Sequence, residues 1–451
     1  MGWTYTLAEL AVAAGAPQEV PDVGFSAIST DTRTLSPGDL FFALRGPNFD
    51  GADYVEEAFA KGACAAVTSK ASDAGPCVIV ADPLQALQAL AAFHRRRCEA
   101  TVLALTGSCG KTTSKDLVAS VLATRHNVVA TQGNLNNDIG CPLSLLRMNT
   151  DTDVAVLEMG ANHPGEIASL CSLARPNEAA ITMIAPAHLE GFGTVDKVAE
   201  AKAEIVDALP ADGVFYLNTD DAHCVRIAER FPGETVTFGQ DGEVSLQSYH
   251  PGQGGEAVLC VAPVGELRLP LVCRAHAQSV LLAVAVGLHN DVEEFEAPLR
   301  EALLSSPRVK LIEVGHLRVL DDTYNANPAS MTAALESLAD NAGRGARIAV
   351  LGDMFELGRN APALHRELGE RAYRAGVGRL LLLGEHAADV AAGARDAGLD
   401  NVEVYADHAS LAAELAVTAP ANATILVKGS RGMRMERVIE LLRERFAEDK
   451  G

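Results

Sequence analysis

The sequence predicts an α/β protein with three domains, and three observations lead to this prediction. The chain has 451 residues, and a domain takes about 150 residues on average. Hydrophobic residues make up 48% of the sequence and charged residues 21%, so each domain can bury a normal core. From about residue 100 onward, strand-like apolar runs alternate with helical patterns, as in parallel sheets covered by helices.

The first two segments of the chain differ in their predicted elements. In residues 1–99, short strand-like runs such as residues 40–44 are broken by turns, and a helix is predicted over residues 83–97. The regular alternation begins in residues 100–307, where a β-rich insertion is also predicted over residues 239–270. The other elements predicted there are strands at residues 101–106, 153–158 and 179–184 and a helix at residues 114–124.

A second α/β pattern follows in residues 308–451. Its predicted strands are residues 347–351, 379–383, 401–405 and 424–427, and its clearest helices are residues 362–375 and 433–446. Ligands of such domains bind in clefts at the carboxyl ends of the strands. We therefore expect the functional site where the domains meet.

Composition excludes several classes of function. With 37 basic and 59 acidic residues the formal net charge is −22, and such a surface repels nucleic acids and anionic lipids. The nine cysteines form no CxxC pair, which indicates reduced thiols rather than disulfides. No signal peptide is visible, and the longest apolar run, residues 280–288, is far shorter than the about 20 residues that span a bilayer. We expect a cytoplasmic monomer that binds neither nucleic acid nor membrane.

Residues 106–113, with the sequence TGSCGKTT, form a variant phosphate-binding loop between a predicted strand and a helix. Backbone N–H groups and the helix N-terminus can receive phosphate oxygens there, Lys111 would neutralise phosphates and Thr112 would ligate magnesium. The strict motif requires glycine at position 105, where this chain has Leu105. ATP binding is still favoured over a plain glycine turn. The predicted ATP-binding residues of the loop are Gly107, Ser108, Cys109, Gly110, Lys111, Thr112 and Thr113.

Two residues near the loop extend the predicted site. Glu158 ends the next apolar strand, where a carboxylate is either a solvated strand end or a magnesium ligand, and its place after a phosphate loop favours the ligand. Cys109 lies inside the cationic loop, which should favour its thiolate. We therefore expect ATP to protect Cys109 from alkylation.

Lys202 lies on the apolar face of a predicted helix, four residues after Val198 and three before Ile205. Such a lysine either snorkels from the edge of the face or is buried. Burial lowers the pKa of a lysine by up to about 3 to 5, which leaves part of the amine neutral. A neutral amine can take up carbon dioxide and form a carbamate able to ligate magnesium. His188 lies one loop upstream and shares the strand-end rim with Glu158.

Several segments together resemble the Mur ligase family. The phosphate loop matches the family's version of this motif, and residues 29–46 resemble its uridine-nucleotide module. The other matching segments, in chain order, are residues 133–140, 158–167, 186–192, 321–328, 351–358 and 427–431. They extend over nearly the whole chain. Segments 133–140 and 321–328 are most similar to the family member that adds a dipeptide.

The resemblance implies both an architecture and an activity. It implies a small α/β domain for a UDP-linked substrate in residues 1–99, a central P-loop ATPase-like domain with a parallel sheet in residues 100–307 and a Rossmann-like α/β ligase domain in residues 308–451. The implied enzyme is an ATP-dependent ligase that adds D-alanyl-D-alanine to a UDP-N-acetylmuramoyl tripeptide through an acyl phosphate. This reaction would complete the cytoplasmic peptidoglycan precursor, and domain closure would assemble the site.

The same resemblance implies roles for individual residues. One magnesium ion would be held by Thr112 and Glu158, and a second by His188 and a carbamylated Lys202. The implied catalytic residues are Lys111, Glu158, His188 and Lys202. The implied ATP contacts outside the loop are His276, Arg308, Asp322 and Asn325. The implied substrate contacts are Ser29, Thr30, Arg33, Asn134, Asn136 and Asn137.

Four positions depart from the family pattern, and one of them is Pro307, where glycine is usual. Ala52 stands where the family usually has histidine, and His276 and Ser279 stand where it has asparagines near the adenine. Two alternatives are a sibling ATP-dependent amide ligase with a different acceptor and a non-catalytic ATP-dependent scaffold. The scaffold predicts loss of the loop lysine or the metal ligands, and these residues are present. The third residue of the tripeptide, lysine or diaminopimelate, stays open.

Overall fold

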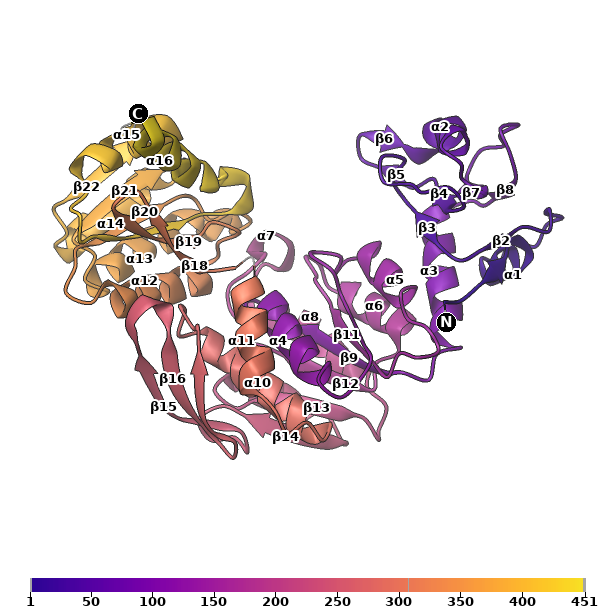
Figure 1. Cartoon of the computed structure of the whole chain (residues 1–451), viewed down its shortest axis with the longest axis horizontal. Helices are drawn as coiled ribbons and strands as arrows, with labels where there is room; N and C mark the ends of the chain where they lie inside the picture. The colour runs from indigo at the N-terminus through magenta and orange to yellow at the C-terminus, as the bar shows by residue number, and fades with distance from the viewer. Residues whose placement is uncertain (1, 307, 449–451) are drawn as a thin grey trace.

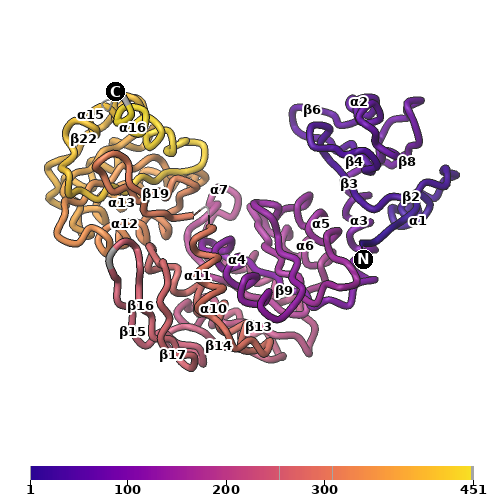
Figure 2. The backbone as a smooth tube through the Cα atoms, in the orientation of Figure 1, coloured from indigo at the N-terminus to yellow at the C-terminus, as the bar shows by residue number. Residues whose placement is uncertain are grey.

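The computed structural model describes residues 2–306 and 308–448 and divides into three domains. The amino-terminal and carboxy-terminal domains stand on either side of the central domain (Figure 1). The backbone tube shows that each domain is one continuous stretch of chain (Figure 2). The predicted α/β class is confirmed, because the two largest sheets each have six strands that are mainly parallel and alternate with helices.

The amino-terminal domain is built on a four-stranded parallel sheet in the order β3-β4-β7-β8. Its elements are β1 (Tyr5–Thr6), α1 (Leu7–Ala13), β2 (Gly24–Phe25), β3 (Ile28–Ser29), β4 (Leu40–Phe42), β5 (Arg45–Gly46), β6 (Phe49–Asp50), η1 (Gly51–Tyr54), α2 (Val55–Ala60), β7 (Ala65–Thr68), β8 (Cys77–Ile79) and α3 (Pro83–Arg95). Asp82 caps α3, since its side chain accepts from the N–H groups of Leu84 and Gln85. Helix α3 leads directly into the central domain (Figure 1).

The central domain has a six-stranded parallel sheet in the order β10-β11-β9-β12-β13-β14. Its strands are β9 (Thr101–Thr106), β10 (Val128–Ala130), β11 (Val154–Glu158), β12 (Glu178–Ile181), β13 (Val214–Asn218) and β14 (Glu234–Phe238). Strand β12 ends three residues before its predicted end at residue 184. Beyond it the backbone leaves the ladder, since the N–H of Ile184 donates to Asp221 and that of Ala185 donates to Ser108.

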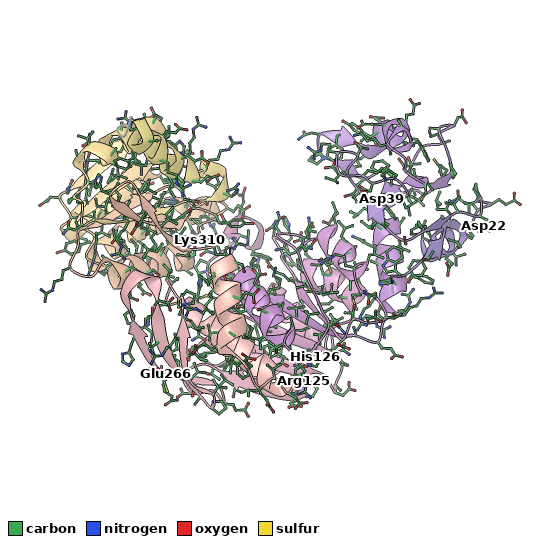
Figure 3. The ribbon with its side chains drawn as sticks, in the orientation of Figure 1. Asp22, Asp39, Arg125, His126, Glu266 and Lys310 are labelled. Carbon is green, nitrogen blue, oxygen red and sulfur yellow. The ribbon has the colours of Figure 1, made fainter. Side chains whose placement is uncertain are left out.

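Helices cover both faces of this sheet, and a separate antiparallel sheet forms the predicted insertion. The helices are α4 (Lys111–Leu122), α5 (Gly140–Leu145), α6 (Glu166–Ala174), α7 (Leu189–Phe192), α8 (Val195–Asp207), α9 (Ala222–Ala228), α10 (His276–His289) and α11 (Glu296–Ser305). The insertion consists of β15 (Ser245–Pro251), η2 (Gln253–Gly255), β16 (Ala257–Ala262) and β17 (Gly265–Leu269). Its edge strand β17 exposes Glu266, a charge that discourages pairing with another chain (Figure 3).

The carboxy-terminal domain has a sheet in the order β18-β19-β23-β20-β21-β22, parallel except for β18. The strands are β18 (Lys310–Val314), β19 (Leu317–Asp322), β20 (Arg347–Leu351), β21 (Arg379–Leu383), β22 (Val402–Tyr405) and β23 (Thr424–Lys428). The helical elements are α12 (Pro328–Ala342), η3 (Gly358–Asn360), α13 (Ala361–Arg374), α14 (Ala387–Ala397), α15 (His408–Thr418), η4 (Arg431–Met433) and α16 (Glu436–Glu448). Helix α16 begins three residues later than predicted because Arg434, with φ of +51°, interrupts the helical path.

Strand order determines where a ligand can bind. In the central sheet, β9 lies between β11 and β12, and in the carboxy-terminal sheet β23 lies between β19 and β20. At such a position, the connections that follow two adjacent strands run to opposite faces of the sheet. This divergence opens a crevice at the carboxyl ends of the strands. Within the residues that the structure describes, no helix combines the length and apolar character needed to cross a bilayer.

Candidate functional site

The loop between β9 and α4 has the backbone of a phosphate-binding loop. Gly107 has φ of +149° and Gly110 has φ of +80°. A Cβ on Gly107 would lie 1.9 Å from Oγ1 of Thr182, so only glycine fits there. Helix α4 begins at Lys111 and not at residue 114 as predicted, which places the lysine and both following threonines on its first turn. The unpaired N–H groups of that turn are suited to an anion.

Side chains beneath the loop hold it in place. The hydroxyl of Ser108 donates to the carbonyl of Ala185 at 2.9 Å and accepts from its N–H at 3.0 Å. Thr182 donates through Oγ1 to the carbonyl of Cys109 at 2.6 Å. Nζ of Lys111 donates to the carbonyl of Gly107 at 2.8 Å, which keeps the lysine close to its own loop.

The expectation that Cys109 favours its thiolate is wrong. Burial raises the pKa of the Cys109 thiol, and the nearby charges of Lys428 and Lys111 offset only part of this effect. Desolvation therefore outweighs the cationic neighbours that are visible in the sequence. Cys109 is a protonated thiol at neutral pH, so rapid alkylation is no longer expected.

The loop opens into a cavity of about 790 Å³ between the central and carboxy-terminal domains. The predicted residues that line it are Ser108, Cys109, Gly110, Lys111, Thr112, Thr113, Asn134, Asn136, Asn137, Glu158, His188, His276, Arg308, Asp322 and Asn325. Five other predicted residues are not part of its lining, namely Gly107, Lys202, Ser29, Thr30 and Arg33. The structure thus brings the predicted ATP and metal residues together, apart from one glycine and one lysine.

Glu158 offers an unsatisfied carboxylate oxygen to this cavity. The side chain is only 2% exposed, and Oε1 accepts from Nδ2 of Asn136 at 2.7 Å. Among the described residues, Oε2 is buried and has no hydrogen-bond partner. A buried carboxylate oxygen in this state is suited to a cation. Asn137, the residue after Asn136, makes a structural contact, because its Oδ1 accepts from the N–H of Gly140 at 2.9 Å.

Lys202 is buried, as its place on the apolar face predicts. It lies on α8, is 1% exposed and has the fully buried Val198 and Ile205 on the same face. Burial, together with the charge of Lys111, lowers the pKa of Lys202 to about 7. A substantial fraction of the Lys202 amine is therefore neutral at physiological pH.

His188 stands immediately before α7 with φ of +51°, and its Nδ1 lies 2.5 Å from Oε2 of Glu356. Burial lowers the pKa of His188, while the carboxylate of Glu356 works against this effect. Glu356 belongs to the matching segment 351–358, but the sequence assigned it no role. Its place just beyond the end of β20 was the available signal.

No described group of three or more histidine, cysteine, aspartate or glutamate side chains has a metal-binding arrangement. A cation in this cavity would therefore depend on mixed ligands. The predicted ligands that line the cavity are the Glu158 carboxylate, the His188 ring and the Thr112 hydroxyl. A modified Lys202, which is buried outside this lining, is the fourth predicted ligand.

The carboxy-terminal domain contacts the phosphate loop directly. Nη2 of Arg308 donates to Oγ1 of Thr112 at 2.7 Å, and the Arg308 guanidinium lies 3.5 Å from the centre of the Tyr324 ring. Nδ2 of Asn327 donates to the carbonyl of Ser108 at 3.3 Å. The contributions of Tyr324 and Asn327 were missed, although both lie in the segment 321–328.

A buried ion pair fixes the carboxy-terminal side of the cavity. Nζ of Lys428 lies 2.7 Å from Oδ2 of Asp322 and donates to the carbonyl of Asn325 at 2.8 Å. The sequence named Asp322 and Asn325 but not Lys428, which ends β23. The pair orients the end of β19 and the segment that follows it.

The departures near the predicted adenine site have different consequences. Burial lowers the pKa of His276 to about 4, so this ring is neutral at pH 7 and can donate or accept one hydrogen bond at each nitrogen. Ser279 is buried, and its hydroxyl accepts from Ser114 at 2.9 Å. Ser279 thus joins α10 to α4, and only His276 has ring atoms suited to reading a base.

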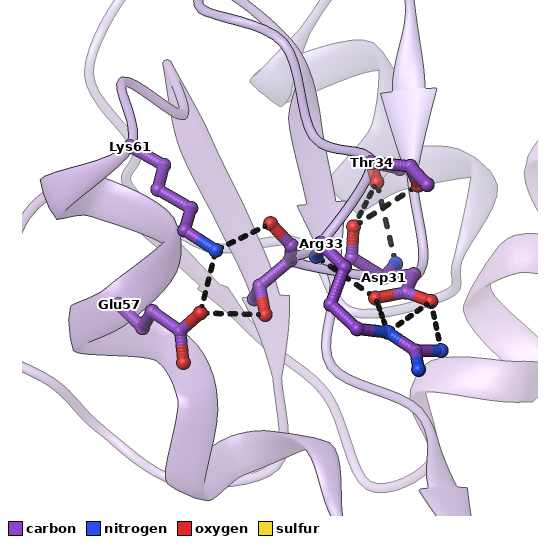
Figure 4. Close-up of polar contacts among 7 residues, drawn as sticks. Asp31, Arg33, Thr34, Glu57 and Lys61 are labelled. Carbon is purple, nitrogen blue, oxygen red and sulfur yellow. Dashed lines mark hydrogen bonds and ion pairs between the residues drawn. The ribbon is translucent and has the colours of Figure 1, made fainter.

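The predicted substrate residues of the amino-terminal domain lie away from the cavity. The exposed guanidinium of Arg33 pairs with Asp31, with Nη2 to Oδ2 at 2.6 Å (Figure 4). Oγ of Ser29 donates to the carbonyl of Asp31 at 2.9 Å. Arg33 lowers the pKa of Asp31 to about 2. In the same close-up, Lys61 donates to the carbonyl of Thr32 at 2.9 Å (Figure 4). The segment of residues 29–33 is thus held by hydrogen bonds within itself and from Lys61, and the side chain of Arg33 lies at the surface.

Comparisons with known proteins agree with this geometry. Residues 25–96, 105–287 and 307–431 match the family models described as "Mur ligase family, catalytic domain", "Mur ligase middle domain" and "Mur ligase, glutamate ligase domain". The UDP-N-acetylmuramoyl-tripeptide–D-alanyl-D-alanine ligase of Escherichia coli is 38% identical, over 97% of this chain and 98% of its own. A crystal structure of MurF from Acinetobacter baumannii superposes with a TM-score of 0.89 at 30% identity, covering 98% of this chain and 99% of the other. The ADP complex of MurF ligase from Thermotoga maritima, 27% identical, covers 94% of this chain and 98% of its own with a TM-score of 0.83. The chain belongs to the Mur ligase family.

Proposed function

We propose that this chain joins D-alanyl-D-alanine to a UDP-N-acetylmuramoyl tripeptide in the synthesis of the peptidoglycan precursor, with conversion of ATP to ADP and phosphate. The tripeptide carboxylate attacks the γ-phosphorus of ATP, ADP leaves, and an acyl phosphate is formed. The amino group of the dipeptide then attacks the acyl carbon, phosphate leaves, and the nitrogen loses a proton. Relatives that carry this activity in their names match nearly the whole chain, which supports this substrate pair.

The observation that carries the proposed mechanism is the cavity between the central and carboxy-terminal domains. The phosphate loop enters it from one side and Arg308 from the other. Charge on the transferring phosphoryl group must be stabilised by cations, and we assign this task to Lys111 and Arg308. The contacts of Lys111 with Gly107 and of Arg308 with Thr112 support this assignment, since both cations lie at the phosphate loop.

We infer two magnesium sites. Thr112 and Glu158 would hold one ion, and His188 with a carbamylated Lys202 would hold the other. The free Oε2 of Glu158 and the neutral fraction of the Lys202 amine fit these roles. Bound magnesium would neutralise phosphate charge as the γ-phosphoryl group is transferred.

We assign substrate binding to two groups of residues. The surface segment with Ser29, Thr30 and Arg33 would receive the diphosphate of the UDP group, since arginine forms paired hydrogen bonds to phosphates. The second group, Asn134, Asn136 and Asn137, lines the cavity next to Glu158, where the tripeptide carboxylate must arrive. Because the uridine segment is separate from the cavity, the substrate would extend from one domain to the next. We place the enzyme in the cytoplasm as a monomer.

Phosphate release tests the proposal. The purified chain is incubated with ATP, magnesium and the UDP-muramoyl tripeptide, with or without D-alanyl-D-alanine, and the product is identified by mass. We expect release that requires both substrates and a pentapeptide product. Release with another amine but not with D-alanyl-D-alanine would instead establish a sibling ligase with a different acceptor. An Arg33→Ala variant should raise the KM for the UDP substrate by about tenfold and leave kcat unchanged.

A further inference from the structure

Glu356 of the carboxy-terminal domain faces His188 of the central domain. Oε2 of Glu356 lies 2.5 Å from Nδ1 of His188. A carboxylate only accepts hydrogen bonds, so Nδ1 must carry the hydrogen. In the neutral ring this leaves the lone pair on Nε2, the nitrogen that does not face Glu356. His188 lines the cavity, and Nε2 is thus the atom available to a metal.

A second contact fixes the orientation of Glu356 relative to α7. Its carbonyl accepts from the N–H of Glu190 at 3.1 Å, two residues after His188. The main chain and the side chain of Glu356 therefore both contact the start of α7. Helix α7 lies at the junction of the central and carboxy-terminal domains (Figure 1). Two contacts from one residue restrict rotation as well as distance.

The turn that carries Glu356 is held rigidly within its own domain. The N–H groups of Met354 and Phe355 donate to Nε2 of His365 at 2.9 Å and to Oγ of Ser430 at 2.8 Å. Just before them, the carboxylate of Asp353 accepts from the N–H groups after β21 at 2.7 and 3.1 Å. These bonds support the left-handed backbone of Glu356, with φ of +62°, which residues with a Cβ seldom adopt.

We propose that Glu356 is a positioning residue that orients His188 as a metal ligand, so that the second magnesium site is complete only when the carboxy-terminal domain is docked. The inference rests on the proposed function, since it takes His188 as a ligand. A histidine that binds a metal usually donates its other N–H to a carboxylate or carbonyl, which fixes the ring and raises its basicity. Here the carboxylate comes from another domain, so domain closure and metal binding are linked.

Manganese binding to the full-length enzyme tests this inference. Mn²⁺ replaces magnesium, a non-hydrolysable ATP analogue is present, and electron paramagnetic resonance measures the free ion. We expect two ions in the unaltered chain, and in Glu356→Ala and Glu356→Gln one ion bound as before and the second bound about 10- to 100-fold more weakly. Glu356→Asp, which keeps the carboxylate, should recover part of the loss. The matched control is Glu385→Gln, an exposed glutamate just beyond the next strand, β21.

A second readout separates orientation of the ligand from a general loss of structure. The magnesium concentration for half-maximal ligase activity should rise in the Glu356 variants, while the KM for ATP at saturating magnesium stays close to normal. Thermal unfolding identifies variants that are misfolded, and Glu356→Gln keeps the size of the side chain. Two ions of unchanged affinity in both variants would overturn the role of Glu356 alone. A single ion in the unaltered chain would overturn the metal site at His188 and this inference with it.

Discussion

The two joints between the three domains are built from different chemistry. At the first joint, buried residues of the amino-terminal domain such as Tyr5 and Leu90 share one hydrophobic core with residues of the central domain such as Leu145. At the second joint, the buried core residues described for the carboxy-terminal domain all come from residues 314–442. Among the described residues, only partly buried apolar residues cross this joint, Val272 onto the carboxy-terminal core and Leu364 onto the central one. Polar groups meet there as well, as in the contact of Arg308 with Thr112.

The difference indicates which joint can open. Separating the first joint would expose a continuous apolar surface to water, at about 25 cal/mol for each Å². Separating the second would expose apolar residues that are only partly buried, such as Val272 and Leu364. It also exchanges hydrogen bonds between domains for hydrogen bonds to water, which costs about 0.5 to 1.5 kcal/mol for each bond. We therefore expect the carboxy-terminal domain to move when nucleotide enters, and the amino-terminal domain to stay fixed to the central one.

The largest expected effect comes from the polar joint. Lys111→Ala removes the loop cation, and we expect turnover to fall by about 10³-fold, or about 4 kcal/mol of barrier. The unfolding midpoint should stay unchanged, since the hydrogen bond that Nζ of Lys111 donates within the described residues goes to its own loop. Turnover and denaturant unfolding of the same preparation check both parts. Turnover within tenfold of the unaltered chain would remove the phosphate loop from the mechanism.

The apolar joint should respond in the opposite way. Tyr5 is 4% exposed, and its hydroxyl lies 2.8 Å from Nδ1 of His94. Tyr5→Ala should lower the free energy of unfolding by about 3 kcal/mol, because it leaves a cavity in a shared core, with turnover of the folded protein preserved. Tyr373→Ala, at a tyrosine that is 44% exposed, is the control. A large loss of turnover at constant stability would mean that the two joints are not separate in function.

The sequence predicted what depends on local pattern and missed what depends on contact between domains. Helical spacing was enough to place Lys202 on a buried face, because a helix repeats every 3.6 residues wherever it packs. The partnership of His188 with Glu356 joins different domains, and spacing along the chain carries no information about it. The prediction for Cys109 was wrong for a related reason. The charge of Lys111 can be read from the sequence, whereas the burial that raises the pKa of the Cys109 thiol depends on the tertiary structure.

Lys202 lies beside the apolar core of the first joint and is influenced by a charge of the polar joint. The pH dependence of its carbamylation tests whether both affect it. It stands on α8 beside Val198 and Ile205 of the shared core, yet Lys111 of the polar joint contributes to its pKa of about 7. Carbamate formation requires the neutral amine, whose fraction grows as pH rises through this pKa. We expect the ¹³C signal of a carbamate, formed with labelled bicarbonate, to grow between about pH 6 and pH 8.

Two variants assign that signal to its residue. Lys202→Arg should abolish it, and Lys197→Ala, at an exposed lysine of the same helix, should leave it intact. A signal that is absent at every pH would rule out the carbamate, and one that survives in Lys202→Arg would assign it elsewhere.

The smallest expected effect is a fluorescence signal that does not change. Trp3 is the single tryptophan of the chain and belongs to the apolar joint. Its ring stacks on Tyr5 with centroids 5.1 Å apart, and Nε1 donates to the carbonyl of Leu146 in the central domain at 2.5 Å. If only the polar joint moves, a non-hydrolysable ATP analogue with magnesium should reduce the radius of gyration in small-angle scattering and leave the Trp3 emission maximum in place. A shift of the emission maximum together with the change in the radius of gyration would show that the apolar joint moves too. The two joints would then differ in the residues that form them but not in whether they move.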